Sequence, residues 1–126
     1  MSYKIEHQLD QSTIIITYLG EFDEDAIRKS LNELYQLLNN VEAPVSIIAD
    51  YSQYEFGFNE LLSGTSLARN LKNPFTHHNC QKLIMVSESN LLKASLKGFQ
   101  QFGLVNDIKI VTSINAALEI SSSINE

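Results

Sequence analysis

The chain has 126 residues, of which 44% are hydrophobic and 19% are charged, and its formal net charge is −6. This length is usual for one domain, so we expect a single domain over residues 1–126, and the composition excludes a disordered chain. The nine Lys and Arg residues are scattered and are outnumbered by 15 Asp and Glu residues, which argues against nucleic acid as a partner.

Targeting and cofactor signals are missing from the sequence. No apolar run approaches the ~20 residues needed to cross a membrane, and the start, MSYKIEHQLD, lacks the apolar centre of a signal peptide. We therefore expect a soluble cytoplasmic protein with no integral membrane segment. No P-loop, HExxH or GxSxG motif occurs, and no GxGxxG follows a strand, so we expect no cofactor.

The N-terminal part of the chain predicts two strands and a helix. Residues 2–9 alternate polar and apolar side chains, as in a half-buried strand, and TIIITYL at 13–19 is apolar on both faces, as in a more central one. We expect these strands to form a hairpin. Asp23 can cap a helix whose apolar positions recur at helical spacing: Ile27, Leu31, Leu34, Leu38 and Val41.

The rest of the chain alternates strands and helices. We expect strands at 45–50, 82–86 and 108–111, a loop at 70–79, and helices from Asn59 to about Leu71, from Ser89 or Asn90 to Phe102, and after a Ser113 cap. Gly103 is placed to end the second of these helices. The order β-β-α-β-α-β-α-β-α predicts an α/β fold with a mixed, mostly parallel sheet of about five strands. The first strand should lie antiparallel at one edge, with helices packed on the sheet.

Three motifs carry a resemblance to a known family: IIADYS (Ile47 to Ser52) with the turn YEFGFNELL after it, KLIMVSES, and IKIVTSINAALEI (Ile108 to Ile120). Together with the element order, they resemble the SpoIIAA-like branch of the STAS and SEC14 group over nearly the whole chain. STAS names the domain shared by sulfate transporters and anti-sigma-factor antagonists. The resemblance implies a STAS-like fold and makes a partner-switch role an expectation.

Regulatory members of that family carry a phosphorylatable Ser in an Asp-Ser-Ser-Gly run, at the start of the helix after the third strand. When Asp50-Tyr51-Ser52 is aligned with the family's Asp-x-Ser, the run corresponds to Phe58-Asn59-Glu60-Leu61, which contains no hydroxyl residue. Glu60 could mimic a permanent phosphate charge, since phosphate adds about −1.5 to −2. The helix dipole alone also favours a Glu in a first turn.

The junction after the third predicted strand is our candidate partner or ligand surface, because ligands of open α/β sheets lie outside the carboxyl ends of the strands. Its candidate residues are Asp50, Ser52, Tyr54, Phe56, Phe58, Asn59 and Glu60. Asp50 and Ser52 could instead serve ordinary turn chemistry. The aromatic residues of this region, which also include Tyr51 and Phe75, could equally close the core.

A second group of reactive residues is His77, His78 and Cys80. Imidazole and thiolate bind metals, and Cys-His pairs can act as nucleophiles. A structural zinc site needs four ligands, and a triad needs an orienting acid, and the sequence singles out neither. We therefore expect a polar loop with Cys80 buried at the start of a strand, and no catalytic or metal-ligating residue.

Taken together, these patterns predict a non-enzymatic binding or regulatory module that engages a protein partner or a small apolar ligand at the junction. One alternative is a SEC14-like carrier of lipid or another apolar ligand, with a cavity lined by Phe56, Phe58, Leu61 and Phe99. Another is a small enzyme in which His77 or His78 meets Asp50 or another acid. A homodimer is a further expectation: the first strand could pair at its edge, although Lys4 and Glu6 could discourage this.

Overall fold

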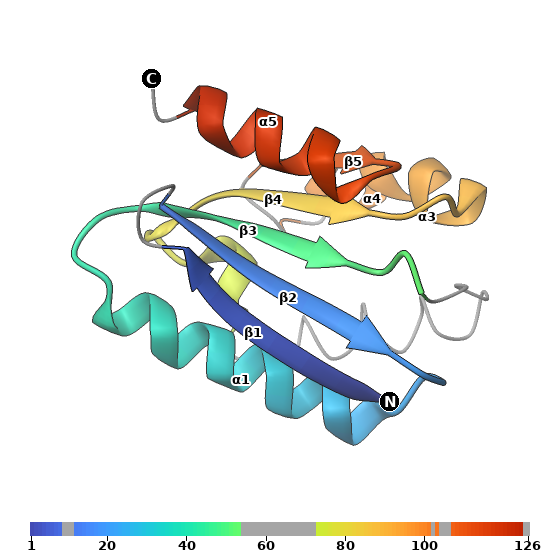
Figure 1. The fold of residues 1–126 in the computed structure, drawn as a ribbon, viewed down its shortest axis with the longest axis horizontal. Helices are drawn as coiled ribbons and strands as arrows, with labels where there is room; N and C mark the ends of the chain where they lie inside the picture. The colour runs from blue at the N-terminus through green and yellow to red at the C-terminus, as the bar shows by residue number, and fades with distance from the viewer. Residues whose placement is uncertain (9–11, 54–72, 102, 104–106, 125–126) are drawn as a thin grey trace.

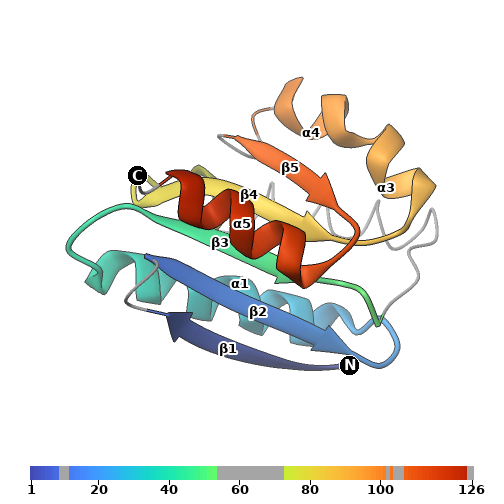
Figure 2. The same cartoon turned by 45° about the horizontal axis from the view of Figure 1, so that its top comes forward.

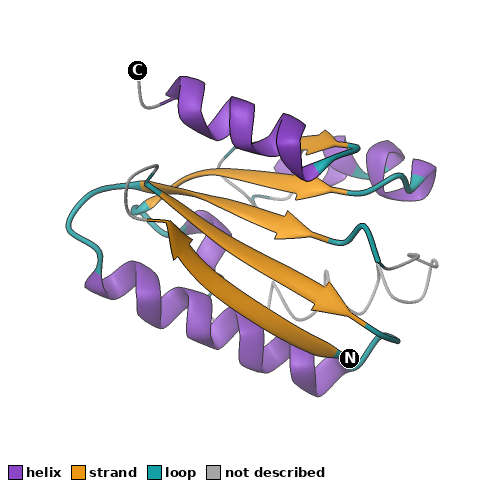
Figure 3. Ribbon diagram, in the orientation of Figure 1, coloured by secondary structure: helices purple, strands orange, loops and turns teal. Residues whose placement is uncertain are grey.

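The computed structural model describes residues 1–8, 12–53, 73–101, 103 and 107–124. Its centre is a five-stranded sheet in the order β1-β2-β3-β4-β5, so strands that follow one another in the chain are also neighbours in the sheet (Figure 1, Figure 3). β1 pairs antiparallel with β2, and the pairs β2–β3, β3–β4 and β4–β5 are parallel. The strands are β1 (Ser2–Gln8), β2 (Thr13–Leu19), β3 (Val45–Asp50), β4 (Cys80–Val86) and β5 (Ile108–Val111).

Helices cover both faces of this sheet. The described helices are α1 (Glu24–Asn40), the short 3-10 turn η2 (Pro74–Thr76), α3 (Asn90–Ala94), α4 (Leu96–Gln101) and α5 (Ile114–Ile124). α1 lies along one face and α5 along the other (Figure 2). Within the described ranges, no helix is both long and apolar enough to cross a membrane.

Two apolar cores result from the alternation of side chains along the strands. Ile14 and Ile16 of β2 face α1, and they join Leu34 and Leu38 of that helix in the larger core. Ile15, between them, faces α5 and belongs to the smaller core with Ile48, Ile84 and Ala117. The run TIIITYL is apolar on both faces because β2 is covered on both sides, as the sequence indicates.

Most predicted elements are confirmed. β2, β3 and β5 have the predicted bounds, Asp23 caps α1 through its carboxylate, and Ser113 caps α5 by accepting a hydrogen bond from the Ala116 N–H at 3.1 Å. Gly103 follows α4 with a φ of +70°, a conformation that suits glycine. The helix predicted from Asn59 to about Leu71 lies outside the described residues.

Two predicted bounds are wrong. β4 begins at Cys80 rather than at 82, because Cys80 already pairs with Val45 of β3. The single helix predicted from Ser89 or Asn90 to Phe102 is broken at Ser95 into α3 and α4. The Ser95 hydroxyl donates a hydrogen bond to the carbonyl of Leu91 at 2.9 Å, the back-bonding by which serine bends a helix.

Candidate functional site

Asp50 and Ser52 form a turn at the carboxyl end of β3. The Ser52 N–H donates a hydrogen bond to Oδ1 of Asp50 at 2.9 Å, which is the geometry of an Asx turn. Asp50 is half-buried and Ser52 is exposed. The turn interpretation of this pair is therefore confirmed, and Asp50 serves the local backbone while Ser52 stays accessible.

The other five candidate residues, Tyr54, Phe56, Phe58, Asn59 and Glu60, lie outside the described residues. The position that the family resemblance assigns to the phosphorylated Ser is among them. The same holds for Leu61, and the side chain of Phe99 is also outside the described part, so the cavity expected of a lipid carrier stays a prediction.

Two of the aromatic residues that the sequence associated with the junction belong to the core. Tyr51 is 9% exposed, and its ring stacks on that of Tyr18 with centroids 4.9 Å apart and planes 6° from parallel. Phe75, which is partly buried, packs against the same α1-side core. Of the two interpretations of these aromatic residues, closure of the core holds for Tyr51 and Phe75.

Described helices from each connection between the parallel strands pack on the same face of the sheet, the α1 side. The β2–β3 connection contains α1, the β3–β4 connection contains η2, which packs against α1, and the β4–β5 connection contains α3, whose Leu92 enters the α1-side core. Ligand crevices of open sheets arise where successive connections pass to opposite faces. The described connections keep to one face, so a site at this end has to be argued from its side chains.

The exposed side chains at this end include two large hydrophobic ones. Leu19 ends β2 and is 46% exposed, and Leu91, in the first turn of α3 beyond β4, is 37% exposed. These are the large exposed hydrophobic residues of the described part of the chain. Because β3 lies between β2 and β4, they flank the Asp50 turn on its two sides. With the exposed Glu88 they form what we call the carboxyl-end surface: Leu19, Asp50, Ser52, Glu88 and Leu91.

Sequence reasoning missed both leucines, because each fits the apolar pattern of its own element. In the structure Leu19 shares a strand face with Thr17, which is only partly buried, so this face of β2 is less covered toward the end of the strand. No signal in the sequence marks Leu91, which lies next to the buried Leu92 in the short helix α3.

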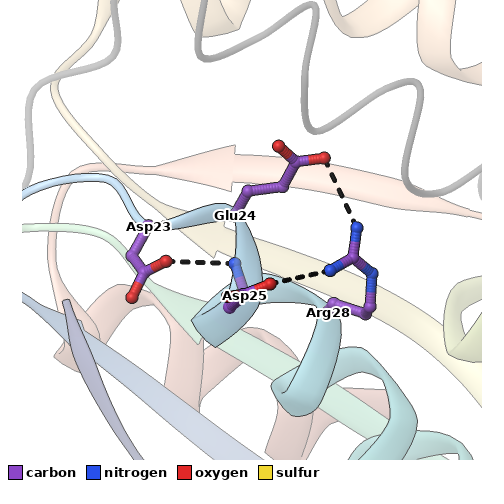
Figure 4. A network of polar contacts seen from close by, with 4 residues as sticks. All are labelled: Asp23, Glu24, Asp25 and Arg28. Carbon is purple, nitrogen blue, oxygen red and sulfur yellow. Dashed lines mark hydrogen bonds and ion pairs between the residues drawn. The ribbon is translucent and has the colours of Figure 1, made fainter.

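Acidic side chains gather at the start of α1, close to the end of β2. Figure 4 shows the Asp23 carboxylate accepting a hydrogen bond from the Asp25 N–H at 3.0 Å, while Arg28 pairs with Asp25 at 2.8 Å and with Glu24 at 3.5 Å. The cap satisfies a free N–H of the first turn, and the helix dipole favours acids there. All four side chains are exposed, so these carboxylates are explained by helix capping.

His77 lies at the opposite end of the sheet from Asp50. Asp50 is level with Val86, the last residue of β4, whereas His77 precedes Cys80, the first. At about 3.3 Å per residue the two ends of β4 are roughly 20 Å apart. The meeting of His77 or His78 with Asp50, one of the pairings that the enzyme alternative allowed, is therefore not formed.

The His77 ring is instead held by structural contacts. Its Nδ1 accepts a hydrogen bond from the Asn79 N–H at 3.0 Å, so its proton is on Nε2, which lies 2.8 Å from Oδ1 of Asn39. The ring stacks on His78 at 4.4 Å and meets Tyr35 edge-on at 5.0 Å. Burial, and next the charge of His78, lower the pKa of His77, which favours the neutral form.

The residues after His77 tie this loop to the end of α1. The Asn79 side chain donates to the carbonyls of Leu38 at 2.8 Å and Val41 at 3.4 Å, groups that a helix end leaves unpaired. Cys80 is 3% exposed, and burial raises the pKa of its thiol to about 12, so it is not a thiolate at neutral pH. We call this group the amino-end cluster: Tyr35, Asn39, His77, His78 and Asn79.

The described part of the chain holds no cluster of metal-ligating side chains, and comparison with known proteins gives no match. Within that part of the chain, no three His, Cys, Asp or Glu side chains are placed to hold a metal ion. No family model, curated protein or solved structure matches the chain. The candidate function therefore depends on the carboxyl-end surface itself.

Proposed function

We propose that this protein is a non-enzymatic, cytoplasmic binding module of STAS-like type that engages a protein partner through the carboxyl-end surface. One observation carries the proposal: the two large exposed hydrophobic side chains of the described part lie on either side of the Asp50 turn, Leu19 at the end of β2 and Leu91 in the helix α3 that follows β4. Single exposed leucines are ordinary, and these two support the proposal because both lie at the same end of the sheet, beside an accessible turn.

The charges around these leucines favour a basic partner. Asp50 and Glu88 carry no basic partner in any ion pair formed within the described residues, and Glu21 and Asp23 stand at the nearby turn after β2. Charged residues at the rim of an apolar contact steer association and reject partners of like charge. A partner that offers an apolar patch bordered by Lys or Arg would fit this surface.

The test is affinity purification of the tagged protein from the cells that make it, with quantitative mass spectrometry of bound proteins. We compare the wild type with the double variant Leu19→Glu/Leu91→Glu. The expected result is one or more proteins retained by the wild type and reduced at least tenfold in the double variant, because two charges enter the apolar contact.

The matched control is His78→Glu, which places a charge on an exposed residue at the other end of the sheet. It should retain the wild-type set of bound proteins. Equal recovery with all three baits would contradict the proposal, and so would loss with the control alone. Circular dichroism of each variant checks that the fold is kept, since all three side chains are exposed.

A further inference from the structure

Among the described residues, β1 has a strand partner on one side only, so it presents an open edge of the sheet. It pairs with β2 on one side and stands at the end of the strand order, so Figure 1 shows it along one margin of the sheet. All seven residues from Ser2 to Gln8 are in register with β2, which makes β1 a long and regular edge. Such an edge exposes a row of backbone N–H and C=O groups that can pair with another strand.

The charges on β1 are arranged as a self-complementary pair. Lys4 and Glu6 point to the same face, their side chains are 72% and 46% exposed, and Nζ of Lys4 lies 2.8 Å from Oε1 of Glu6. Charged residues on an edge strand usually guard against pairing with a second chain. Here one positive and one negative residue stand two positions apart, so their effect depends on the register of an incoming strand.

Only one symmetric register satisfies these charges. In an antiparallel pair of identical strands, residues opposite one another lie on the same face of the sheet. One residue of each strand is therefore opposite its own copy, and the two-fold axis lies midway between these two copies; we name the axis by that residue. An axis at Lys4 or at Glu6 would set two like charges directly opposite, which is destabilising. An axis at Ile5 sets each Lys4 opposite the Glu6 of the other copy, giving alternating charges.

The same register is also the longest. An axis at Ile5 places Ser2 opposite Gln8 and Tyr3 opposite His7, so all seven residues of β1 find a partner. An axis shifted by one residue to either side leaves two positions of each strand without a partner. Charge pairing and strand length therefore select the same arrangement.

We propose that β1 is a homodimer interface, in which β1 pairs antiparallel with β1 of a second copy about a two-fold axis at Ile5. The two sheets then form one continuous sheet of ten strands. Because the axis reverses strand direction, the two carboxyl-end surfaces point to opposite ends of the dimer and stay open. This inference is independent of the partner-binding function proposed above.

Charge exchange between Lys4 and Glu6 tests both the interface and its register. The variants are Lys4→Glu, Glu6→Lys and the double exchange Lys4→Glu/Glu6→Lys, measured by sedimentation equilibrium over a series of concentrations. Each single variant replaces two attractive cross-strand pairs by two repulsive ones. We expect its dimer dissociation constant to rise about tenfold, and the double exchange to restore the wild-type value.

Three results would overturn the proposal: a wild-type protein that stays monomeric up to millimolar concentration, a dimer indifferent to the single variants, or a double exchange that fails to restore dimerisation. Lys4 and Glu6 are exposed, so the monomer should keep its fold, and urea unfolding of each variant verifies this. An Ile5→Cys variant adds a register check: a short bifunctional thiol reagent should link two copies through residue 5, since directly opposite residues have Cβ atoms about 4.5–5.5 Å apart. Failure to cross-link while the charge variants behave as expected would overturn the Ile5 axis.

Discussion

The two ends of the parallel sheet use their polar residues in different ways. At the amino end, His77, Asn39 and Asn79 bond to one another and to the end of α1, and Thr13 of β2 bonds to Ser121 of α5 in the buried interior. At the carboxyl end, the hydrogen bond of the Asp50 turn is local, and Leu19 and Leu91 face solvent.

This difference separates residues that hold the fold from residues available to a partner. His77, His78 and Cys80 were candidates for chemistry in the sequence because of their reactive side chains. In the structure His77 and Cys80 are buried, and His78 stacks on His77. The residues left exposed at the carboxyl end are chemically plain.

Replacing His77 by Ala should destabilise the fold more than any change in the Asp50 turn. The variant leaves Asn39 and the Asn79 N–H without their ring partner and removes two ring contacts, so we expect a loss of about 2–4 kcal/mol in the free energy of unfolding. Asp50→Ala removes one hydrogen bond at the surface and should cost less than about 1 kcal/mol. Urea unfolding measures the free energy of unfolding of both variants. Equal losses would contradict the claim that the polar residues at the amino end stabilise the fold more than those at the carboxyl end.

Because the Thr13 and Ser121 hydroxyls form a buried hydrogen bond, we expect substitutions of the two residues to have non-additive effects on the free energy of unfolding. Thr13→Val leaves the Ser121 hydroxyl with one partner fewer and should cost about 1–2 kcal/mol, as should Ser121→Ala. Removing both hydroxyls should cost less than the sum of the single changes. The measurement is a double-mutant cycle in urea; strict additivity would mean that the contact contributes nothing.

Stability should fall with acid because of His77. The pKa of its ring is lowered from 6.5 by burial and then by His78, so between the folded and unfolded values the unfolded chain binds a proton that the folded chain does not. The stability that this contributes is present above pH 6.5 and is lost as pH falls through the folded pKa. Urea unfolding against pH should show this slope in the wild type, and His77→Gln should flatten it; identical slopes would refute the assignment.

Ser46 is an exception at the amino end. Its hydroxyl is buried in β3 and has no hydrogen-bond partner in the described part of the chain, unlike that of the neighbouring Thr13. Ser46→Ala removes an unpaired polar group, so we expect the free energy of unfolding to stay within about 0.5 kcal/mol of the wild type or to rise. A loss well beyond that in thermal or urea unfolding would reveal a partner for the hydroxyl.

Local patterns were sufficient to predict most of the fold. A strand is predicted by the β-branched run 13–19, and a helix by the spacing of Ile27, Leu31, Leu34 and Leu38. Both predictions succeed because burial of an element's faces determines which of its positions are apolar. The helix break at Ser95 was missed because it depends on a single hydrogen bond, from the Ser95 hydroxyl to the Leu91 carbonyl. The spacing of apolar residues carries no information about such a bond.

The site was harder to predict because exposure is a tertiary property. Asp50 and Ser52 were found from their place after a strand, and their turn bond follows from residue type alone. The pairing of His77 with Asn39 joins residues 38 positions apart, and no local pattern foretells it. Leu19 and Leu91 are indistinguishable from core leucines until the neighbouring elements are placed.

The central claim, that partners meet the carboxyl end and leave the amino end alone, has one direct test. A photo-cross-linking amino acid is placed at Ser52 in one variant and at His78 in another, both exposed residues, and the protein is irradiated in the cells that make it. The account predicts a cross-linked adduct of discrete mass with the Ser52 probe and none at that mass with the His78 probe. The same adduct from both probes, or adducts from His78 alone, would contradict it.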